Sequence, residues 1–575
     1  MPQTLTTDIL VVGGGVGGSC AAIQAARRGA NVILVSKFDW LGGMLTSAGV
    51  AVPDGNELVP WQTGLWGAFL QALRDRQPGG LDHNWVSFFG YEPKIGAAIF
   101  ADWVAALPNL QWLAGQVPLE VHRAGDRITG VRFADYDIRT KITLDGTELG
   151  DLLALGDASY RWGWEWRSDF NEPSAPPQPN AMTERYPVQS PTWVVYLEDY
   201  GQPAPEIPAP EIDTHGEFAG AWDNYGAERF LNYGRIPGNQ FMLNWPIHGN
   251  DYGVGLERLV GSAAERAAYH QEAHAHSQAF ARFLQQNIDS RYGLARGTFP
   301  EGAFALHPYY RESRRLRGLS TVVETNILPQ TGGVAAPLPS YAGEMNAIAV
   351  GNYPDDHHYP GFEFPLQPKS MHWGGHWTGT PFTVPYTALV PETLTGLLVC
   401  EKNISVSHIA NGSTRLQPMV MGIGQAAGMA AALCIEQVCE PAELPVRSLQ
   451  EALITDAIAP SAVIPLLDLV PQHPDWLQWQ RHYLAHPEDY PVDGQCGCDR
   501  IECPISTTAA TIQGKLEIVG GNTFQLTTPE RLWPLVTLHP AVHEDFQGLR
   551  SGQILSVVGR PNPAGDWFVV EKVGI

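Results

Sequence analysis

Apolar residues run without interruption through two short segments near the start of the chain. The first segment is Asp8-Ile-Leu-Val-Val12 and the second is Asn31-Val-Ile-Leu-Val35. Uninterrupted apolar runs of this length are typical of strands buried on both faces of a parallel sheet. Residues 19–29, between the two segments, are rich in small side chains and predict a helix that packs closely on that sheet. The pattern therefore predicts a strand–helix–strand unit of about 30 residues.

The turn between the first strand and the helix is Gly13-Gly14-Gly15-Val16-Gly17-Gly18. In this motif Gly13 permits a sharp turn, Gly15 lets the backbone approach a pyrophosphate, and Gly18 lets the helix lie close to the strand. The start of the helix offers free N–H groups and a partial positive charge to phosphates. The turn therefore predicts a dinucleotide site, and a Gly-rich turn without a ligand is the alternative.

The end of the second strand departs from the usual pattern. Ser36, followed by Lys37, stands where an acidic residue usually binds the ribose hydroxyls. A second Gly-rich loop, residues 38–49 with Gly42 and Gly43, follows at once. Two Gly-rich loops near one pyrophosphate favour FAD over a nicotinamide, and no second G-x-G-x-x-G in a strand–helix context predicts a separate nicotinamide domain. The flavin loop offers no His or Cys at residues 44–47, so noncovalent FAD is expected.

Several further blocks make the chain resemble a known family. It is similar to the large FAD-dependent oxidoreductase family with a glutathione-reductase-like flavin domain, in particular to the subgroup called simply FAD-dependent oxidoreductases. The resemblance spans roughly residues 5 to 440 and implies flavin chemistry on a Rossmann-like domain. The blocks that carry it are 12–18 with 40–43, 145–155 (similar to the D-A-T-G-x-G-D-L segment of the family), 310–315, 353–358, and 403–428.

The last of these blocks predicts a second flavin-binding segment. Gly396-Leu-Leu-Val-Cys400 predicts a strand, and residues 422–436 predict a helix rich in Ala and Gly. The helix start, expected at about Gly422 to Gln425, is a potential anion site. The resemblance implies that this start faces the pyrimidine end of the flavin ring, where it would stabilise negative charge on the reduced flavin. A buried structural helix is the alternative.

Three candidate catalytic or structural residues lie near this block. His408 and Arg415 are expected in the loop between the strand and the helix, which borders the flavin on the resemblance. His408 could act as a general base, could bind the substrate, or could fix the loop backbone. Arg415 could anchor a carboxylate, although a structural ion pair is favoured. Tyr386 is expected near the entry to the flavin domain.

The middle of the chain supplies two more candidates. Residues 160–384 are rich in aromatic side chains and suit a cavity lined by rings. Arg311 could clamp an anionic group, and a structural network of this Arg cluster with Glu312 and Asp356 is the favoured alternative. His372-Trp-Gly-Gly-His376 would be a metal pair only on a helix, which the Gly pair disfavours. A loop that presents His376 to the substrate, or simple loop packing, is expected instead.

The remaining site predictions concern the cofactor and metals. No metal site is expected, because Cys496, Cys498 and Cys503 have no obvious fourth ligand, and a turn with reduced thiols is the default. The residues predicted to contact FAD are Gly13, Gly15, Val16, Gly17, Gly18, Ser36, Lys37, Gly42, Gly43, Met44, Val117, Asp151, Asn403, Gly424, Gln425 and Ala426.

Composition narrows the possible partners. Among 575 residues, 36 Lys and Arg against 60 Asp and Glu give a net charge of −24, which disfavours nucleic acid and anionic membranes. No segment reaches about 18 uninterrupted apolar residues, and no signal sequence precedes the first strand, so a cytoplasmic location is expected. Expected partners are a small-molecule substrate and O₂ or another electron acceptor, with a homo-oligomer left open.

Together these patterns predict an α/β protein: a discontinuous Rossmann-like FAD-binding domain, an inserted α+β substrate domain and a small C-terminal β-rich module, OB-like in one interpretation. The predicted activity is removal of a hydride from a small organic substrate such as an alcohol or amine. Alternatives are a flavoprotein subunit of an electron-transfer assembly and a non-redox, flavin-dependent hydratase or isomerase. The expected boundaries are 5–159 and 385–440 for the FAD domain, 160–384 for the substrate domain, 441–504 for a helical linker and 505–575 for the β module.

Overall fold

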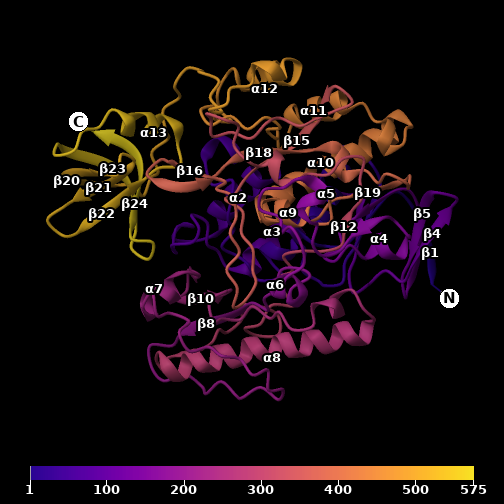
Figure 1. Cartoon of the computed structure of the whole chain (residues 1–575), viewed down its shortest axis with the longest axis horizontal. Helices are drawn as coiled ribbons and strands as arrows, with labels where there is room; N and C mark the ends of the chain where they lie inside the picture. Colours follow the sequence, from indigo (N-terminus) through magenta and orange to yellow (C-terminus); the bar gives the residue numbers. More distant parts are fainter. Residues whose placement is uncertain (1, 575) are drawn as a thin grey trace.

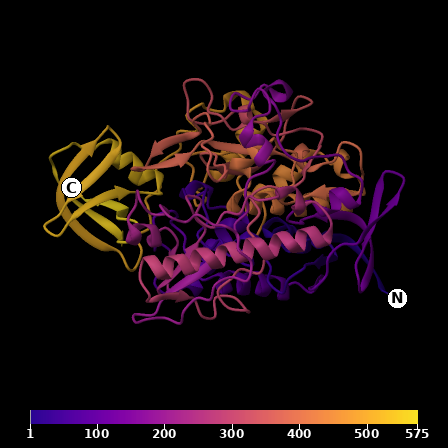
Figure 2. The same cartoon turned by 60° about the horizontal axis from the view of Figure 1, so that its bottom comes forward.

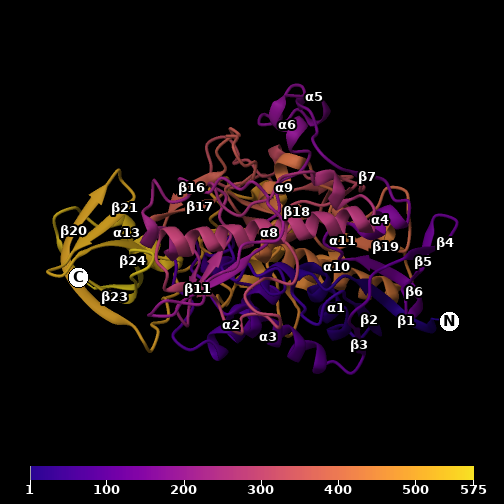
Figure 3. The same cartoon turned by 90° about the horizontal axis from the view of Figure 1, so that it is seen from below.

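The computed structural model describes residues 2–574. The molecule is elongated, with a small barrel at one end and the N-terminal strands near the other (Figure 1). The long helix α8 (Ala263–Asn287) runs across the body between these two ends (Figures 2 and 3).

The central sheet is assembled from both ends of the sequence. Its strand order is β3-β2-β1-β6-β5-β4, and a seventh strand, β19, pairs with β6. The pairs β1·β2, β2·β3, β1·β6 and β6·β19 are parallel, whereas β4 and β5 extend the sheet in antiparallel fashion. Since β19 follows the inserted region, the predicted discontinuous Rossmann-like domain is confirmed. The strands are β1 (Gln3–Val12), β2 (Val32–Val35), β3 (Leu110–Leu113), β4 (Glu120–Ala124), β5 (Arg127–Arg132), β6 (Tyr136–Asp145) and β19 (Leu397–Val399).

Two helices of this domain touch through their backbones. Helix α1 (Val16–Arg27) follows β1, and helix α10 (Gln417–Gln437) comes from the C-terminal half. A Cβ on Gly424 would lie only 2.3 Å from the carbonyl oxygen of Gly17, so no larger residue fits there. The other helices of the domain are α2 (Gly64–Arg76), α3 (Pro93–Ala105), α4 (Asp151–Leu155) and α9 (His408–Thr414).

Helix α10 is long and apolar enough, by length and composition, to cross a membrane. However, 89% of its apolar window is buried inside the protein. Its apolar surface is therefore the core of the FAD domain, because it packs against α1, α2 and β15. Core helices of large sheets commonly have this composition.

The inserted region contains a second, antiparallel sheet with the order β11-β8-β10-β9, and α8 packs against it. Two-stranded pairs complete the region, among them β15·β18, which packs on α10. The elements are β7 (Tyr160–Arg161), α5 (Arg167–Phe170), α6 (Ala181–Arg185), β8 (Val195–Asp199), α7 (Ala227–Asn232), β9 (Arg235–Ile236), β10 (Gln240–Leu243), β11 (Tyr292–Leu294), β12 (Arg315–Leu316), β13 (Ser340–Tyr341), β14 (Glu344–Met345), β15 (Ala347–Asn352) and β18 (Pro381–Pro385).

The segment His372–His376 forms a β-hairpin. Strands β16 (Ser370–Trp373) and β17 (His376–Gly379) are antiparallel, and Gly374 and Gly375 form the turn with φ of +58° and +81°. A loop was predicted here. The structure replaces it with paired strands, because the two glycines adopt the left-handed conformations that a tight hairpin requires.

The C-terminal residues fold into a closed barrel with the order β20-β21-β22-β24-β23. This confirms the predicted small β-rich module, and five strands closed in this way are OB-like. The hairpin described above docks on the barrel: the Thr537 N–H donates to the Gly374 carbonyl (2.7 Å), and the Trp373 and His543 rings stack 4.4 Å apart. The elements are β20 (Ala510–Val519), β21 (Thr523–Thr527), β22 (Leu532–Val536), α13 (Pro540–Gln547), β23 (Ile554–Asn562) and β24 (Trp567–Gly574).

The segment between the FAD domain and the barrel contains short helices separated by irregular chain. Only α11 (Val446–Ile454) and α12 (Trp476–Ala485) are α-helices in residues 441–495, together with short 3₁₀ turns. Prolines at 460, 465 and 471 explain the irregular chain between the two helices, because proline removes a backbone donor and clashes with the preceding turn. All seven cysteines are free thiols.

Candidate functional site

The predicted phosphate cradle is present at the end of β1. Gly13 has φ of +111°, and a Cβ there would lie 2.0 Å from the Gly146 carbonyl oxygen. Gly15 precedes the first turn of α1 and supplies no side chain to cap it. A helix that starts without a capping side chain leaves N–H groups that can bind an anion.

The second Gly-rich loop lies directly against the first. The Gly42 N–H donates to the Gly14 carbonyl at 3.0 Å. A Cβ on Gly43 would lie 2.7 Å from the Gly15 Cα, so the two loops approach closely only because both positions lack side chains. Their predicted proximity is confirmed, and the following Met44 is fully buried in the core behind them.

Three charged residues that the sequence reasoning did not select complete the cradle. The Gly17 N–H donates to the Glu401 carboxylate at 2.8 Å, and Lys402 Nζ bridges Glu401 (3.0 Å) and Glu148 (2.6 Å). Burial raises the pKa of Glu401 above its ordinary value, although Lys402 opposes this effect. Both Glu401 and Lys402 directly follow β19, whose carboxyl end meets that of β1 at the same sheet edge. That position is where ligands bind in open parallel sheets, and it could have revealed them.

These residues fit a dinucleotide. The buried Oε1 of Glu148 has no hydrogen-bond partner, and it would lie 2.9 Å from a Cβ on Gly15. A carboxylate oxygen left without a donor at the cradle suits a sugar hydroxyl, while Lys402 and the start of α1 suit phosphate. We therefore expect Glu148, Glu401, Lys402 and the Gly15 backbone to hold FAD.

At the predicted adenosine end, the Ser36 side chain is already engaged within the protein. Its hydroxyl donates to the Phe38 carbonyl (2.8 Å) and accepts from the Trp112 indole N–H (2.8 Å). Lys37 is exposed, with its ammonium 5.1 Å from the Phe38 ring. Val117 is 46% exposed and follows Gln116, whose N–H donates to the Ser36 carbonyl. The Ser36 hydroxyl therefore joins the end of β2 to Trp112 of β3. Its predicted side-chain contact with the cofactor would require its bonds to Phe38 and Trp112 to change.

Two other predicted cofactor residues have internal partners. Asp151 pairs with Arg266 (3.0 Å) and Arg314 (3.2 Å), which links α4 to α8. Asn403 accepts from the Glu401 N–H and donates to the Asp145 carbonyl, both at 3.1 Å. Asn403 thus positions the Glu401 segment, and Asp151 joins the FAD domain to the inserted region.

The predicted start of the second flavin helix is wrong. Helix α10 begins at Gln417, because Pro418 at its first turn needs no N–H partner there, and not near Gly422. Gly424 and Gln425 therefore lie within the helix, where Gly424 touches α1 and the Gln425 amide bonds to Leu65, Gln24 and Ala459. Ala426 is fully buried in the core. The N-terminal end of the helix is instead at Gln417, whose buried Oε1 has no hydrogen-bond partner.

His408 lies in a short helix, α9, and not in the predicted loop. Ser407 caps this helix by accepting the Ala410 N–H at 3.0 Å, which is the signal the loop prediction missed. The His408 ring is fully buried, bonds to the Tyr359 hydroxyl and to Glu312 (2.9 Å), and stacks on Trp164. Burial lowers the pKa of His408, although Glu312 opposes this effect. Both ring nitrogens are occupied, so this geometry favours a positioning role.

The predicted arginines form buried networks. Arg311 is 1% exposed and donates to Ser190, Thr192 and Asn244 while it pairs with Asp251 at 3.2 Å. Arg311 itself pairs with Asp251, whereas Arg315 of the same cluster pairs with Glu312 at 3.1 Å, as the favoured structural network predicted. Arg415 pairs with Asp356 (3.3 Å) and donates to the Tyr309 hydroxyl, as the favoured ion pair predicted.

Tyr386 lies away from this group. Its hydroxyl donates to the Pro441 carbonyl at 2.8 Å, and burial near Cys434 raises its pKa. Cys434 is near the C-terminal end of α10, about 25 Å along the helix from Gln417. The structure therefore does not bring Tyr386 to the flavin end of the helix, and its contacts are structural.

One pocket of about 200 Å³ is lined by residues from four segments, around positions 53–57, 86–88, 352–354 and 376–379. Asp54, Glu57, Tyr353, His376 and the exposed Trp377 are among its lining residues. Asp54 follows the flavin loop in sequence, and a Cβ on the adjacent Gly55 would be 3.9 Å from the side chain of Leu416, the residue that precedes α10. The pocket therefore adjoins the predicted flavin region, and of the catalytic candidates it includes only His376.

Asp54 is the titratable residue of this pocket that sequence reasoning missed. Its pKa is raised well above the ordinary 3.8, first by burial and then by the nearby carboxylates of Asp356 and Glu57, while Arg415 opposes the shift. A carboxyl group with a raised pKa at the wall of a pocket is a typical candidate for proton transfer. Asp54 lies five residues after Gly49 of the flavin loop, and this proximity was the available signal.

A Gly-rich cradle at an uncapped helix start, at the carboxyl edge of a parallel sheet, is typical of a dinucleotide-binding domain. A family model described as FAD dependent oxidoreductase matches residues 8–453. The chain therefore belongs to the FAD-dependent oxidoreductase family, and FAD is its cofactor.

Parts of the chain are also similar to several solved structures, at low identity. A geranylgeranyl bacteriochlorophyll reductase-like protein from Thermoplasma acidophilum is 10% identical, with 78% of this chain and 84% of that chain covered and a TM-score of 0.34. GidA from Aquifex aeolicus is 20% identical, with 24% of this chain and 25% of the GidA chain covered and a TM-score of 0.20. A myxobacterial chondrochloren halogenase is 14% identical, with 35% of this chain and 45% of the halogenase chain covered and a TM-score of 0.24. The chain thus spans about a quarter of the GidA chain and under half of the halogenase.

The cradle makes a direct prediction about FAD binding. In Gly15→Val, the new side chain would meet the movable ends of Glu401 and Glu148, so the fold adapts while the phosphate space is filled. We expect FAD affinity to fall tenfold or more, which is about 1.4 kcal/mol per factor of ten. Fluorescence titration of the apoprotein with FAD measures this. Gly548→Ala is the control, because Gly548 has a helical φ of −84° and an added Cβ would make only an ordinary 3.5 Å contact with the Asp545 carbonyl oxygen. Unchanged FAD affinity in Gly15→Val would contradict the assignment.

Proposed function

We propose that the protein removes a hydride from a small alcohol or amine held in the pocket beside α10, with Asp54 as the proton acceptor. The observation that carries this proposal is the Asp54 carboxyl at the pocket wall, next to the start of α10. FAD, when bound, supplies the acceptor for the hydride. The residues of the pocket must bind the substrate, orient it and accept its proton.

The charge of the pocket favours a neutral or cationic substrate. Asp54 and Glu57 contribute carboxylates, and no Lys or Arg is among the lining residues. Carboxylates accept hydrogen bonds from hydroxyl and ammonium groups and repel carboxylates. Arg311, which was considered as a clamp for an anion, directs both terminal nitrogens to Asp251, Asn244 and neighbouring groups, and only its buried Nε lacks a partner. An anionic substrate is therefore disfavoured.

The chemistry balances with Asp54 as the base. An alcohol loses the O–H proton to the Asp54 carboxylate and the carbon-bound hydrogen, with its electron pair, as hydride; the product is a carbonyl compound. An amine gives an imine in the same way. O₂ or another acceptor then removes the two electrons from the enzyme. Proton transfer by a positioned carboxylate typically contributes a factor of about 10² to 10⁴ to the rate.

The pocket also contains aromatic and imidazole groups that would orient the substrate. His376 Nε2 is 3.7 Å from the Glu57 carboxylate, and the Trp377 side chain is 69% exposed beside it. Phe88 packs edge-on against His376, with ring centroids 5.2 Å apart. Ring faces next to a few polar groups are typical of sites that orient small organic molecules. These contacts support our proposal that His376 takes part in substrate binding, which the sequence offered as one interpretation of the segment.

A matched substrate series tests the proposal. Compounds with one carbon skeleton that carry an alcohol, an amine or a carboxylate at the same distal position are compared by kcat/KM with an artificial electron acceptor. We expect turnover of alcohols or amines and loss of at least tenfold in kcat/KM when a carboxylate is added. A preference for carboxylate-bearing substrates would contradict the proposed pocket.

The barrel supports this pocket through the hairpin, which yields a further prediction. His543 stacks on Trp373 and accepts the Gly374 N–H at 3.0 Å, so it holds the hairpin that carries His376. We expect His543→Ala to raise KM severalfold, since such ring contacts contribute about 0.5–1.5 kcal/mol, while FAD content is retained. Steady-state kinetics measures this, with the exposed His486→Ala as control. An unchanged KM would instead favour the barrel as a docking module for another protein.

A further inference from the structure

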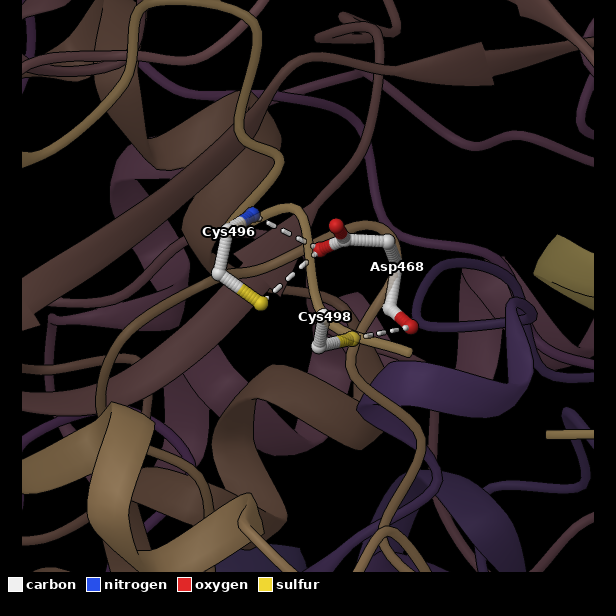
Figure 4. A group of neighbouring side chains, drawn as sticks. All are labelled: Asp468, Cys496 and Cys498. Atoms are coloured by element: carbon white, nitrogen blue, oxygen red, sulfur yellow. Dashed lines mark hydrogen bonds between the residues drawn. The ribbon is translucent and has the colours of Figure 1, made fainter. Parts of the chain in front are cut away.

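A cluster of metal-ligating side chains lies outside the pocket described above. Asp468, Cys496 and Cys498 come from two segments that flank α12, and one ligand atom from each lies within 4.8 Å of the others (Figure 4). All three residues are half-buried, so the cluster is accessible from solvent. The sequence had argued against a metal because three cysteines lacked a fourth ligand, and it could not show that Asp468 is near.

The backbone holds this cluster together. Asp468 Oδ1 accepts the Cys496 N–H (2.9 Å), and Oδ2 accepts the Gly497 N–H (2.7 Å). Gly497 has φ of +67°, a left-handed conformation that turns the chain between the two cysteines. As a result Cys496 and Cys498 both direct their sulfurs toward residue 468 (Figure 4).

The distances match the edges of a metal tetrahedron. Cys496 Sγ is 3.3 Å from the Asp468 carboxylate, and Cys498 Sγ is 3.4 Å from the Asp468 carbonyl oxygen. A tetrahedral zinc ion, with Zn–S of about 2.3 Å and Zn–O of about 2.0–2.2 Å, separates neighbouring sulfur and oxygen ligands by roughly 3.5 Å. The thiol protons that now lie between these atoms are the ones that zinc replaces.

We propose that Asp468, Cys496 and Cys498 form a zinc-binding site. Two thiolates and one carboxylate select zinc over Mg²⁺ or Ca²⁺, which prefer all-oxygen sites. The fourth position is open to water or to the Asp468 carbonyl oxygen. Binding releases the two thiol protons and changes no oxidation state, so zinc affinity rises with pH as thiolates form.

The site would fasten the connection to the barrel. Cys496 and Cys498 lie just before the chain enters the barrel, and Arg500 makes a two-point ion pair with Asp545 of α13 (2.7 and 3.0 Å). A zinc ion that binds only the folded loop stabilises it by mass action. The zinc site thereby fixes the barrel, and with it the hairpin, relative to the FAD domain.

Cys503 supplies a matched control. It belongs to the same run of cysteines, but its thiol is directed to the Pro504 carbonyl at 3.6 Å and packs against the barrel core. It is not part of the three-residue group. Cys503→Ser therefore removes a thiol from the same segment and leaves the proposed ligands in place.

The test uses full-length, FAD-loaded protein that has been reduced and then freed of metal with a chelator and of excess reductant. Co²⁺ is added, absorption is recorded against the flavin background, and Zn²⁺ is used to displace it. We expect one Co²⁺ per chain, with a thiolate charge-transfer band and the visible bands of a tetrahedral ion, all removed by Zn²⁺. Cys496→Ser and Cys498→Ser should abolish the charge-transfer band or halve it. Asp468→Asn removes a direct ligand and should weaken affinity by at least tenfold, since even partners that only orient the ligands contribute about 10–100-fold.

Three results would overturn the proposal. The first is absence of stoichiometric Co²⁺ or Zn²⁺ binding in reduced wild-type protein. The second is an equal loss of binding in Cys503→Ser. The third is a Cys496–Cys498 disulfide, found by mass spectrometry in protein prepared without reductant, together with failure of the same protein to bind metal after that disulfide has been reduced. Retained FAD content in every variant shows that the fold is intact.

Discussion

Asp54→Asn is expected to lower kcat by about 10² to 10⁴-fold while FAD stays bound. The amide keeps the size and the hydrogen-bonding reach of the carboxyl group but cannot accept the substrate proton. Because Asp54 borders the pocket and is not part of the Gly-rich cradle, its loss should leave cofactor content unchanged. Asp75→Asn, on the exposed face of α2, removes the same charge at a surface site and should leave kcat as in wild type.

The same residue predicts a pH dependence. Only the deprotonated carboxylate accepts a proton, so kcat/KM should rise with pH as Asp54 ionises. Since burial, Asp356 and Glu57 raise its pKa well above 3.8, and Arg415 only partly opposes them, the rise should be centred above the range of ordinary aspartates. Asp54→Asn should remove this limb from the profile. A variant that keeps both the limb and most of kcat would show that another group takes the proton.

Arg315→Met is expected to destabilise the protein by about 3–5 kcal/mol. Arg315 is completely buried and pairs with Glu165 (2.9 Å) and Glu312 (3.1 Å). Methionine fills much of the same volume but removes the cation that two buried carboxylates share. As basic partners, Glu165 then keeps only the more distant Arg161 (3.8 Å), and Glu312 keeps only the His408 ring, so the weakened compensation of buried charge carries the cost. Chemical denaturation followed by tryptophan fluorescence measures the change in the free energy of unfolding.

An exposed pair provides the comparison. Arg28 and Glu436 make a salt bridge at 2.8 Å with side chains 41% and 42% exposed. Arg28→Met should cost less than about 1 kcal/mol, because solvent already screens exposed pairs. Equal effects of Arg315→Met and Arg28→Met would show that the buried network around Glu312 and His408 does not stabilise the fold as proposed.

The sequence predicted the FAD domain well because its signals are local. The Gly13–Gly18 turn stands between an apolar strand and a small-residue helix, and each glycine serves a steric requirement that can be stated without a structure. The C-terminal barrel was also recognisable from short alternating strands and Gly-rich turns. These features depend on neighbours in sequence, which determine turns and strand faces directly.

The candidate site was predicted less completely because its parts meet only through tertiary contacts. Glu401 and Lys402 reach the cradle because β19 joins the sheet beside β6, and no local pattern records that pairing. The Ser407 cap on α9 was a local signal for a helix, and the loop prediction did not use it. Asp54 and Asp468 are single acidic residues in irregular chain, so their importance depends on neighbours that the fold brings from other segments.

The most direct test of the proposed function is anaerobic mixing of the FAD-loaded enzyme with an alcohol or amine identified by the matched series. The substrate is used in two forms, with hydrogen or deuterium on the carbon that is oxidised, and loss of flavin absorbance is followed in time. We predict bleaching that is slower with the deuterated substrate in wild type and strongly slowed in Asp54→Asn. No bleaching by any such substrate, despite turnover without net electron transfer, would contradict hydride removal and favour a non-redox role for the flavin.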